Sequence, residues 1–178
     1  MLRLMVFLVM FATAPPALAE EARLDELFAA LKTADESSWE AIEDRIWAEW
    51  SESGSAAMDL LLERGRSAMA ADAPQAAVEH LTALVENAPD FAEGWNARAT
   101  AYFQLGLYGP ALADIARALA LEPRHFGALS GLAVILEETG ALERAARVYG
   151  AALAIHPRRP DLREALDRLE AELRGKSI

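Results

Sequence analysis

Apolar residues along the chain recur at the three- and four-residue spacing of amphipathic helices, and these helical patterns come in pairs. In residues 92–125, two such patterns are separated by a turn at Gly106 and closed by Pro123. The same marks return with a shift of 34 residues at Pro89, Pro123 and Pro157, at Ala77, Ala111 and Ala145, and at Gly106 and Gly140. A fixed period of this length is typical of a solenoid, in which each helical pair buries its apolar face against the next.

The period divides the middle of the chain into three units, residues 58–91, 92–125 and 126–159. Small residues are expected where two helices approach closely, and large residues where the small ones leave volume. These positions are Leu61, Gly65, Ala68, Leu81 and Leu84 in the first unit, Trp95, Ala99, Tyr102, Ile115 and Ala118 in the second, and Leu129, Ala133, Leu136, Tyr149 and Ala152 in the third. The prolines stop the second helix of each unit, and the glycines allow the turn between its two helices.

This arrangement, large–small–aromatic in the first helix and alanine–aromatic–alanine before a closing proline, resembles the tetratricopeptide-repeat family over residues 58–159. The resemblance implies an all-α, right-handed superhelical solenoid of helix-turn-helix hairpins. It also implies a concave groove, lined by the first helix of each repeat, that binds peptide segments of other proteins.

Residues 20–57 predict an N-terminal helical hairpin that is a drifted repeat. Counting back by 34 places Glu43 where the other units have alanine and Ser55 where they have proline. Ser37 and Glu40 have the spacing of a capping box at the start of its second helix.

Three tryptophans, Trp39, Trp47 and Trp50, stand out in this hairpin. Trp47 and Trp50 are expected to face the next hairpin as core, with Trp39 on the rim. The alternative is an aromatic surface for a partner or for self-association.

Residues 160–178 predict a final helix and tail. Leucines lie on one side of this helix and charged residues on the other, as expected of a helix that caps the end of a solenoid.

Residues 1–19 have the features of a signal peptide. Arg3 precedes an apolar run over residues 4–14, and the segment ends in Ala17-Leu18-Ala19, a small-residue cleavage pattern. The run is short for a membrane-spanning helix, so an uncleaved anchor is the alternative. We expect a mature protein that starts at Glu20, without stable membrane insertion, and is periplasmic in a Gram-negative source.

The chain is acidic, with 28 Asp and Glu against 17 Lys and Arg and a net charge of −11. Such a charge repels phosphate backbones and anionic lipid headgroups, so we expect no nucleic-acid partner. A basic partner is compatible with it, as is an acidic surface that only keeps the protein soluble.

Catalytic and metal-binding patterns are missing from the sequence. Cysteine is absent, and His80, His125 and His156 fall at different phases of the repeat, so we expect them on helix surfaces or in loops. No nucleophile elbow or phosphate-binding glycine loop occurs. The sequence therefore predicts a non-enzymatic protein without a cofactor or metal.

By resemblance, a partner would contact a mixed polar and apolar set of groove positions. The set is Arg66, Met69, Glu93, Asn96, Thr100, Phe103, Gln104, Ser130, Val134 and Glu137. Asn96 and Gln104 can hydrogen-bond a peptide backbone, whereas Met69, Phe103 and Val134 can hold apolar side chains. The alternative for Phe103 and Val134 is packing against neighbouring helices.

The subgroup of the family that clamps a C-terminal carboxylate uses Lys, Asn and Arg at set groove positions. This chain has Leu62, Arg66, Ala97, Gly127 and Gly131 there. Only Arg66 can serve, which argues against such a clamp.

The main functional hypothesis is a periplasmic interaction scaffold that holds peptide segments or partner proteins in its groove. The alternatives are a structural homo-oligomer that stacks through its ends and an accessory subunit in cell-envelope biogenesis.

Overall fold

The computed structural model describes residues 16–176, with the side chains of residues 21–175. Over this part of the chain it contains nine α-helices and no strand. The helices are α1 (Pro16–Thr33), α2 (Trp39–Trp50), α3 (Ala56–Ala70), α4 (Pro74–Asn87), α5 (Ala92–Gln104), α6 (Tyr108–Leu121), α7 (Phe126–Glu138), α8 (Leu142–Ile155) and α9 (Pro160–Lys176).

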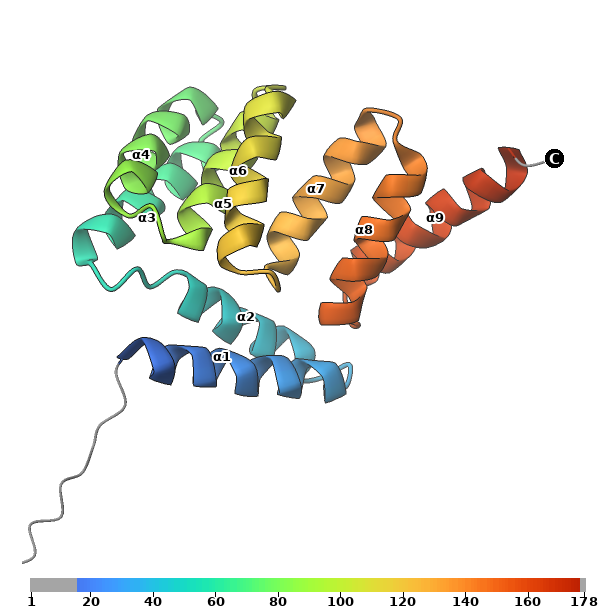
Figure 1. Ribbon diagram of the computed structural model, residues 1–178, viewed down its shortest axis with the longest axis horizontal. Helices are drawn as coiled ribbons and strands as arrows, with labels where there is room; N and C mark the ends of the chain where they lie inside the picture. The colour runs from blue at the N-terminus through green and yellow to red at the C-terminus, as the bar shows by residue number, and fades with distance from the viewer. Residues whose placement is uncertain (1–15, 177–178) are drawn as a thin grey trace, which may run out of the picture.

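Three helical hairpins, α3–α4, α5–α6 and α7–α8, stand side by side, and α9 packs against α8 (Figure 1). The first helices α3, α5 and α7 contact one another in sequence, and α4 and α6 each contact the first helix of the following hairpin. The predicted all-α solenoid with a final capping helix is confirmed.

Each interface between hairpins has its own apolar core. Ala77, Ala111 and Ala145, the alanines repeated at the 34-residue period, have no exposed surface. At Gly65, an added Cβ would lie 2.5 Å from Leu81 Cγ, so the two helices of the first hairpin approach too closely for a side chain there.

The turns inside the hairpins use left-handed backbone at one repeated position. Gly106 has φ +70° and Gly140 has φ +78°. The same position in the first repeat is Asp72, with φ +55°. A short polar side chain tolerates this conformation better than a bulky one, which explains how the turn forms there without glycine.

The N-terminal hairpin α1–α2 does not stack on α3 as a fourth repeat. It lies across the ends of the later hairpins (Figure 1). Its buried core, Leu24, Leu27, Phe28, Leu31, Ile46 and Trp50, closes on Phe126 at the start of α7. The expectation that Trp47 and Trp50 face the next hairpin is therefore corrected: Trp50 is buried and Trp47 partly buried, both against Phe126 of the third repeat.

Glu43 provides a physical reason for this displacement. In each true repeat, the equivalent position is an alanine buried between helices. A carboxylate cannot occupy that position without a charged or hydrogen-bonding partner. In the observed packing Glu43 has such partners, because it lies against His156 and Arg159 at the far end of the solenoid.

The predicted capping box at Ser37 and Glu40 is also corrected. Helix α2 begins at Trp39, and its N-cap Ser38 makes no capping bond. Instead, the Asp35 carboxylate accepts hydrogen bonds from the hydroxyls of Ser38 and Ser37 and from the Ser37 N–H. These bonds, that of Ser38 foremost, lower the pKa of the Asp35 carboxyl.

The predicted signal peptide falls mostly on residues 1–15, which lie outside the described residues. The predicted cleavage bond between residues 19 and 20 lies within α1. Among the described helices, none combines the length and apolar character needed to cross a membrane.

Candidate functional site

The larger of two adjoining clefts lies between the N-terminal hairpin and the first two repeats. Helix α2 forms one wall, and α3 and α5 form the other. The cleft has a volume of about 640 Å³. Its lining residues are Asp44, Trp47, Ala48, Ser51, Arg66, Met69, Glu93, Asn96, Ala97 and Thr100.

The smaller cleft, of about 120 Å³, lies mainly between α5 and α7. It is lined by Asn96, Ala99, Thr100, Phe103, Ile115, Gly127, Gly131, Val134 and Ile135. Asn96 and Thr100 belong to both clefts, so the two adjoin along α5.

Seven of the ten groove positions named by resemblance line these clefts. Arg66, Met69 and Glu93 line the larger cleft, Phe103 and Val134 line the smaller one, and Asn96 and Thr100 line both. Phe103 also stacks on Tyr108, with ring centroids 5.8 Å apart. It therefore packs against a neighbouring helix while presenting surface to the cleft.

The other three positions, Gln104, Ser130 and Glu137, line neither cleft. Gln104 is exposed at the end of α5. The Ser130 hydroxyl donates to the Phe126 carbonyl at 2.7 Å. Glu137 forms a 2.7 Å ion pair with Arg168 of α9.

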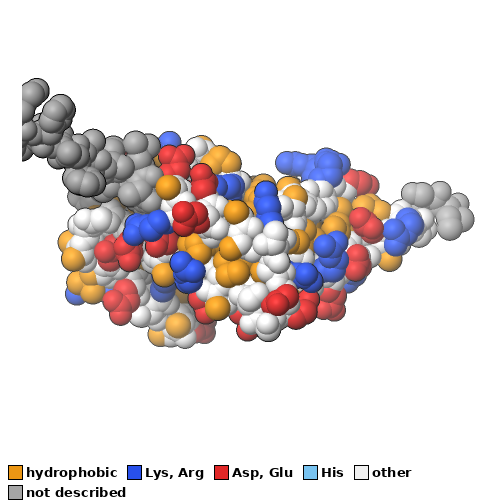
Figure 2. All heavy atoms as spheres, turned by 90° about the horizontal axis from the view of Figure 1, so that it is seen from below, with side chains coloured by type: hydrophobic (Ala, Val, Ile, Leu, Met, Phe, Trp, Pro, Cys, Tyr) orange, Lys and Arg blue, Asp and Glu red, His pale blue; other side chains and the backbone are white. Residues whose placement is uncertain are grey.

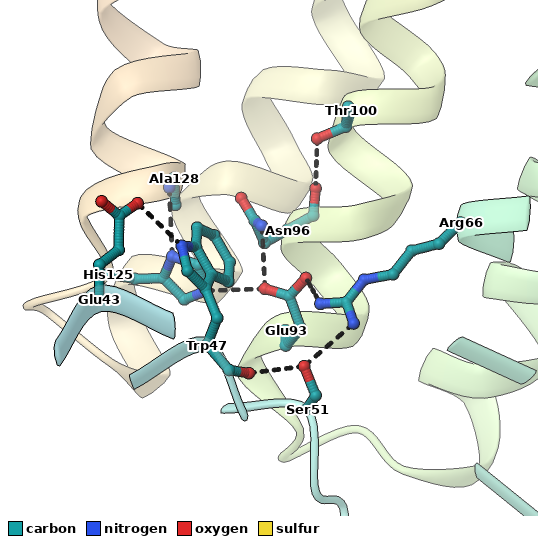
Figure 3. Close-up of polar contacts among 9 residues, drawn as sticks. All are labelled: Glu43, Trp47, Ser51, Arg66, Glu93, Asn96, Thr100, His125 and Ala128. Atoms are coloured by element: carbon teal, nitrogen blue, oxygen red, sulfur yellow. Dashed lines mark hydrogen bonds and ion pairs between the residues drawn. The ribbon is translucent and has the colours of Figure 1, made fainter. Parts of the chain in front are cut away.

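At the base of the larger cleft, Glu93 is buried, with 3% of its surface exposed, and is fully engaged (Figure 3). Its carboxylate accepts from Arg66 Nη2 at 2.7 Å and from Asn96 Nδ2 at 2.9 Å. Its Oε2 also lies 2.9 Å from His125 Nε2. The side chains of Glu93 and Asn96 are therefore committed to internal bonds, and we expect their substitution to reduce stability as well as to alter the groove.

The hydrogen bonds of His125 determine its tautomer. Nδ1 accepts from the Ala128 N–H at 3.2 Å, so Nε2 carries the proton and donates to Glu93. Arg66 also donates to the Ser51 hydroxyl at 3.0 Å. One buried carboxylate thus links α3, α5 and the start of α7, and through Arg66 it reaches the end of α2.

Tryptophans of α2 cover this histidine. Trp50 stacks on the His125 ring with centroids 4.1 Å apart and planes at 10°. Trp47 meets the rings of His125 and Phe126 edge-on, at 5.6 and 5.5 Å. An added Cβ at Gly127 would lie 2.6 Å from Trp47 Cη2, so this glycine leaves the space that the indole fills.

A second histidine–carboxylate pair joins α2 to the end of α8. His156 Nε2 lies 3.0 Å from Glu43 Oε2, and Trp47 Nε1 donates to Glu43 Oε1 at 3.1 Å. Burial by itself would raise the pKa of Glu43, but the bonds from His156 and Trp47 and the charge of Arg159 lower it overall.

The sequence did not predict these contacts between α2 and the solenoid. His125 and His156, expected on helix surfaces or in loops, cap the start of α7 and the end of α8, and both are fully buried. Glu43 in place of the repeat alanine was the available signal. Nothing in the sequence indicates that its partner lies 113 residues away.

The charged groups at the base of the larger cleft are engaged with one another. Within the described residues, no group of three or more His, Cys, Asp or Glu side chains is placed to hold a metal ion. The buried carboxylate and imidazole at the cleft base already satisfy each other, and Arg66 is held by Glu93 rather than free to clamp a carboxylate.

Comparison with known proteins agrees with this geometry. The family model described as Tetratricopeptide repeat matches residues 62–114 and 110–160. A TPR repeat-containing protein of Rhizobium etli is 38% identical over 154 residues, which cover 86% of this chain and 76% of that protein.

Solved structures share the fold at lower identity. The first TPR domain of Spaghetti (RPAP3), bound to the HSP90 peptide SRMEEVD, superposes with a TM-score of 0.64 at 24% identity, over 67% of this chain and 94% of that one. MamA AMB-1 superposes with a TM-score of 0.56 at 18% identity, over 88% of this chain and 84% of that one. The family-model match spans more than half of the sequence, and the chain belongs to the tetratricopeptide-repeat family.

Proposed function

We propose that this protein is an exported interaction scaffold that holds a peptide segment of a partner protein on its concave face. The observation that carries the proposal is the pair of adjoining clefts along α5, lined by seven positions that family resemblance assigns to the groove. A segment lying across Thr100 would contact both clefts.

A peptide-bound relative of the fold supports this reading. The RPAP3 domain is solved with a peptide ending in Glu-Glu-Val-Asp. Among the described residues that line the clefts of this chain, the one cation, Arg66, is paired with buried Glu93, so we expect a ligand of different chemistry from that acidic peptide.

The export part of the proposal rests on residues 1–19. A basic start, a short apolar run and a small-residue end together favour translocation and cleavage before Glu20. In a Gram-negative cell, the partner would then be an envelope protein.

The test places a photo-crosslinking amino acid at Thr100, which is exposed between the clefts, in the full-length chain expressed in its native cell. The matched control carries it at Ala116, exposed on the second helix α6. We expect discrete adducts at Thr100, none at Ala116, and an intact mass that begins at Glu20. Equal adducts at both sites, or none at Thr100, would refute the groove. A chain retaining residues 1–19 in the cytoplasm would refute export alone.

A further inference from the structure

We infer that the N-terminal hairpin is one wall of the binding site, and that the site selects a segment carrying one basic and one aliphatic residue. This inference rests on the proposed function and names the chemistry of the partner. It follows from the charges of the larger cleft, the shape of the smaller one and their shared border.

The larger cleft carries one charged group without a partner. Arg66 and Glu93 neutralise each other at 2.7 Å, and His125 and Asn96 complete the bonds of Glu93. Asp44 also lines the cleft, is exposed on α2, and pairs with no described residue. The cleft therefore presents a net negative charge at its α2 wall.

The surface around Asp44 in this cleft is largely apolar, with Trp47, Ala48, Met69 and Ala97. A lysine or arginine suits such a wall, because its aliphatic stem lies along apolar surface while its charged end reaches the carboxylate. The acidic balance of the whole chain, −11, also favours approach of a basic segment. On the underside of the molecule, Lys and Arg side chains are interspersed with Asp and Glu (Figure 2).

The smaller cleft has the size and lining of a pocket for a single apolar side chain. Its floor is Phe103, Val134, Ile115 and Ile135, and its volume of 120 Å³ is close to the roughly 150 Å³ of a cavity that accepts benzene. Gly131 keeps the pocket open. A Cβ there would lie 3.6 Å from Ile115 Cδ1, an ordinary contact, so a larger side chain would extend into the space.

Asn96 and Thr100 border both clefts, so one extended segment can place its aliphatic residue between α5 and α7 and its basic residue at Asp44. Of the described residues that line the two clefts, only Asp44 of α2 supplies an unpaired carboxylate, which is why the hairpin is part of the site. The repeats alone would keep the aliphatic pocket but lose the preference for a basic residue.

The experiment measures fluorescence polarisation of fluorescein-labelled nonapeptide pools on the mature chain. Each nonapeptide carries two fixed residues, and each pool contains every spacing of these two residues from adjacent to six positions apart. The fixed pairs are leucine with arginine, leucine with glutamate, and serine with arginine. We expect leucine–arginine pools to bind about threefold better than leucine–glutamate pools, as an exposed ion pair allows, and on the order of tenfold better than serine–arginine pools, as burial of an aliphatic side chain allows.

Two pairs of variants test whether Asp44 causes the arginine preference and whether the pocket at Gly131 causes the leucine preference. Asp44→Lys is expected to abolish the arginine preference, whereas Glu40→Lys, an equal charge change one turn earlier on α2, keeps it. Gly131→Leu is expected to abolish the leucine preference, whereas Gly131→Ala keeps it. Circular dichroism of each variant confirms folding.

The inference is overturned if no pool binds, if leucine–glutamate pools bind as well as leucine–arginine pools, or if either preference survives its variant. Crosslinking at Thr100 separates this failure from that of the scaffold itself. If adducts form at Thr100 but the peptides show no preference, the proposed scaffold function stands and only the proposed chemistry of the ligand is refuted.

Discussion

At the scale of single residues, two glycines of α7 have opposite roles although they are one helical turn apart. Gly127 leaves space for the Trp47 indole, since a Cβ there would lie 2.6 Å from Cη2 of that ring. Gly131 faces the smaller cleft, where a Cβ would make only an ordinary contact. The first glycine positions the hairpin, and the second keeps the groove open.

We predict opposite changes in stability for alanine at these two positions. Gly131→Ala should raise the free energy of unfolding by about 0.5–1 kcal/mol, because glycine inside a helix is unfavourable by that amount. Gly127→Ala gains the same helix preference but displaces Trp47, so it should lower the free energy of unfolding by about 1–3 kcal/mol.

Urea denaturation followed by tryptophan fluorescence measures both changes and also reports on the Trp47 environment. Equal stabilisation by the two alanines would show that Trp47 does not pack on Gly127.

The sequence predicts the packing of the repeats more fully than it predicts the candidate site. The repeat cores were predictable because Ala77, Ala111 and Ala145 share one local environment that recurs with the period. The groove positions on α5 were assigned by family resemblance, and all of them but Gln104 line the clefts. The burial of Glu93 between Arg66 and His125 was not predictable, because Arg66 lies 27 residues away in the preceding repeat and His125 lies 32 residues away, just before α7. The Asp44 wall was missed because Glu43 indicates only that α2 departs from the repeat pattern, and not where α2 packs instead.

At the scale of elements, the hairpin α1–α2 is held at two connections, the one between α6 and α7 and the one between α8 and α9. One contact set involves Arg124, His125 and Phe126 before and at the start of α7. The other involves His156, Arg158 and Arg159 after α8, where Arg158 Nε donates to the Ala34 carbonyl at 2.9 Å. Because α2 contributes Glu43 to the second set, its attachment should depend on the charge of that carboxylate.

We predict that Glu43→Gln lowers the free energy of unfolding by about 1–2 kcal/mol at pH 7, near the low end of the roughly 1.5–3 kcal/mol of a hydrogen bond to a charged group, because Glu43 is only partly buried. The pKa of Glu43 is lowered below its ordinary 4.5 in the folded chain. Its contribution is therefore complete above pH 4.5 and is lost as the pH falls through the folded pKa.

Denaturation of both proteins at pH 7 and below pH 4 measures this difference. The gap between wild type and Glu43→Gln should narrow in acid, whereas the exposed neighbour Glu40→Gln should match wild type throughout. A gap that stays constant with pH would show that the loss comes from packing and not from the charge.

At the scale of the whole molecule, the hairpin braces a solenoid whose neighbouring repeats otherwise touch only each other. By lying across the start of α7 and the end of α8, it buries Phe126 completely and covers His125. It also supplies the wall that turns an open concave face into a cleft of about 640 Å³. Stability and binding geometry therefore depend on the same contacts.

We predict that a chain of residues 56–178 folds but melts at least about 3 °C below a chain of residues 20–178. Exposing Phe126 alone costs about 1.5–3 kcal/mol, and each kcal/mol shifts the melting temperature of a domain this size by about 2–4 °C. The shorter chain should also bind a hydrophobic dye, because its exposed apolar surface centres on Phe126. Phe126→Ser in the shorter chain should then reduce dye binding, whereas the same change in the longer chain should destabilise it strongly. Equal melting temperatures with no dye binding would mean that the hairpin rests on the solenoid without bracing it, and that the repeats hold their curvature unaided.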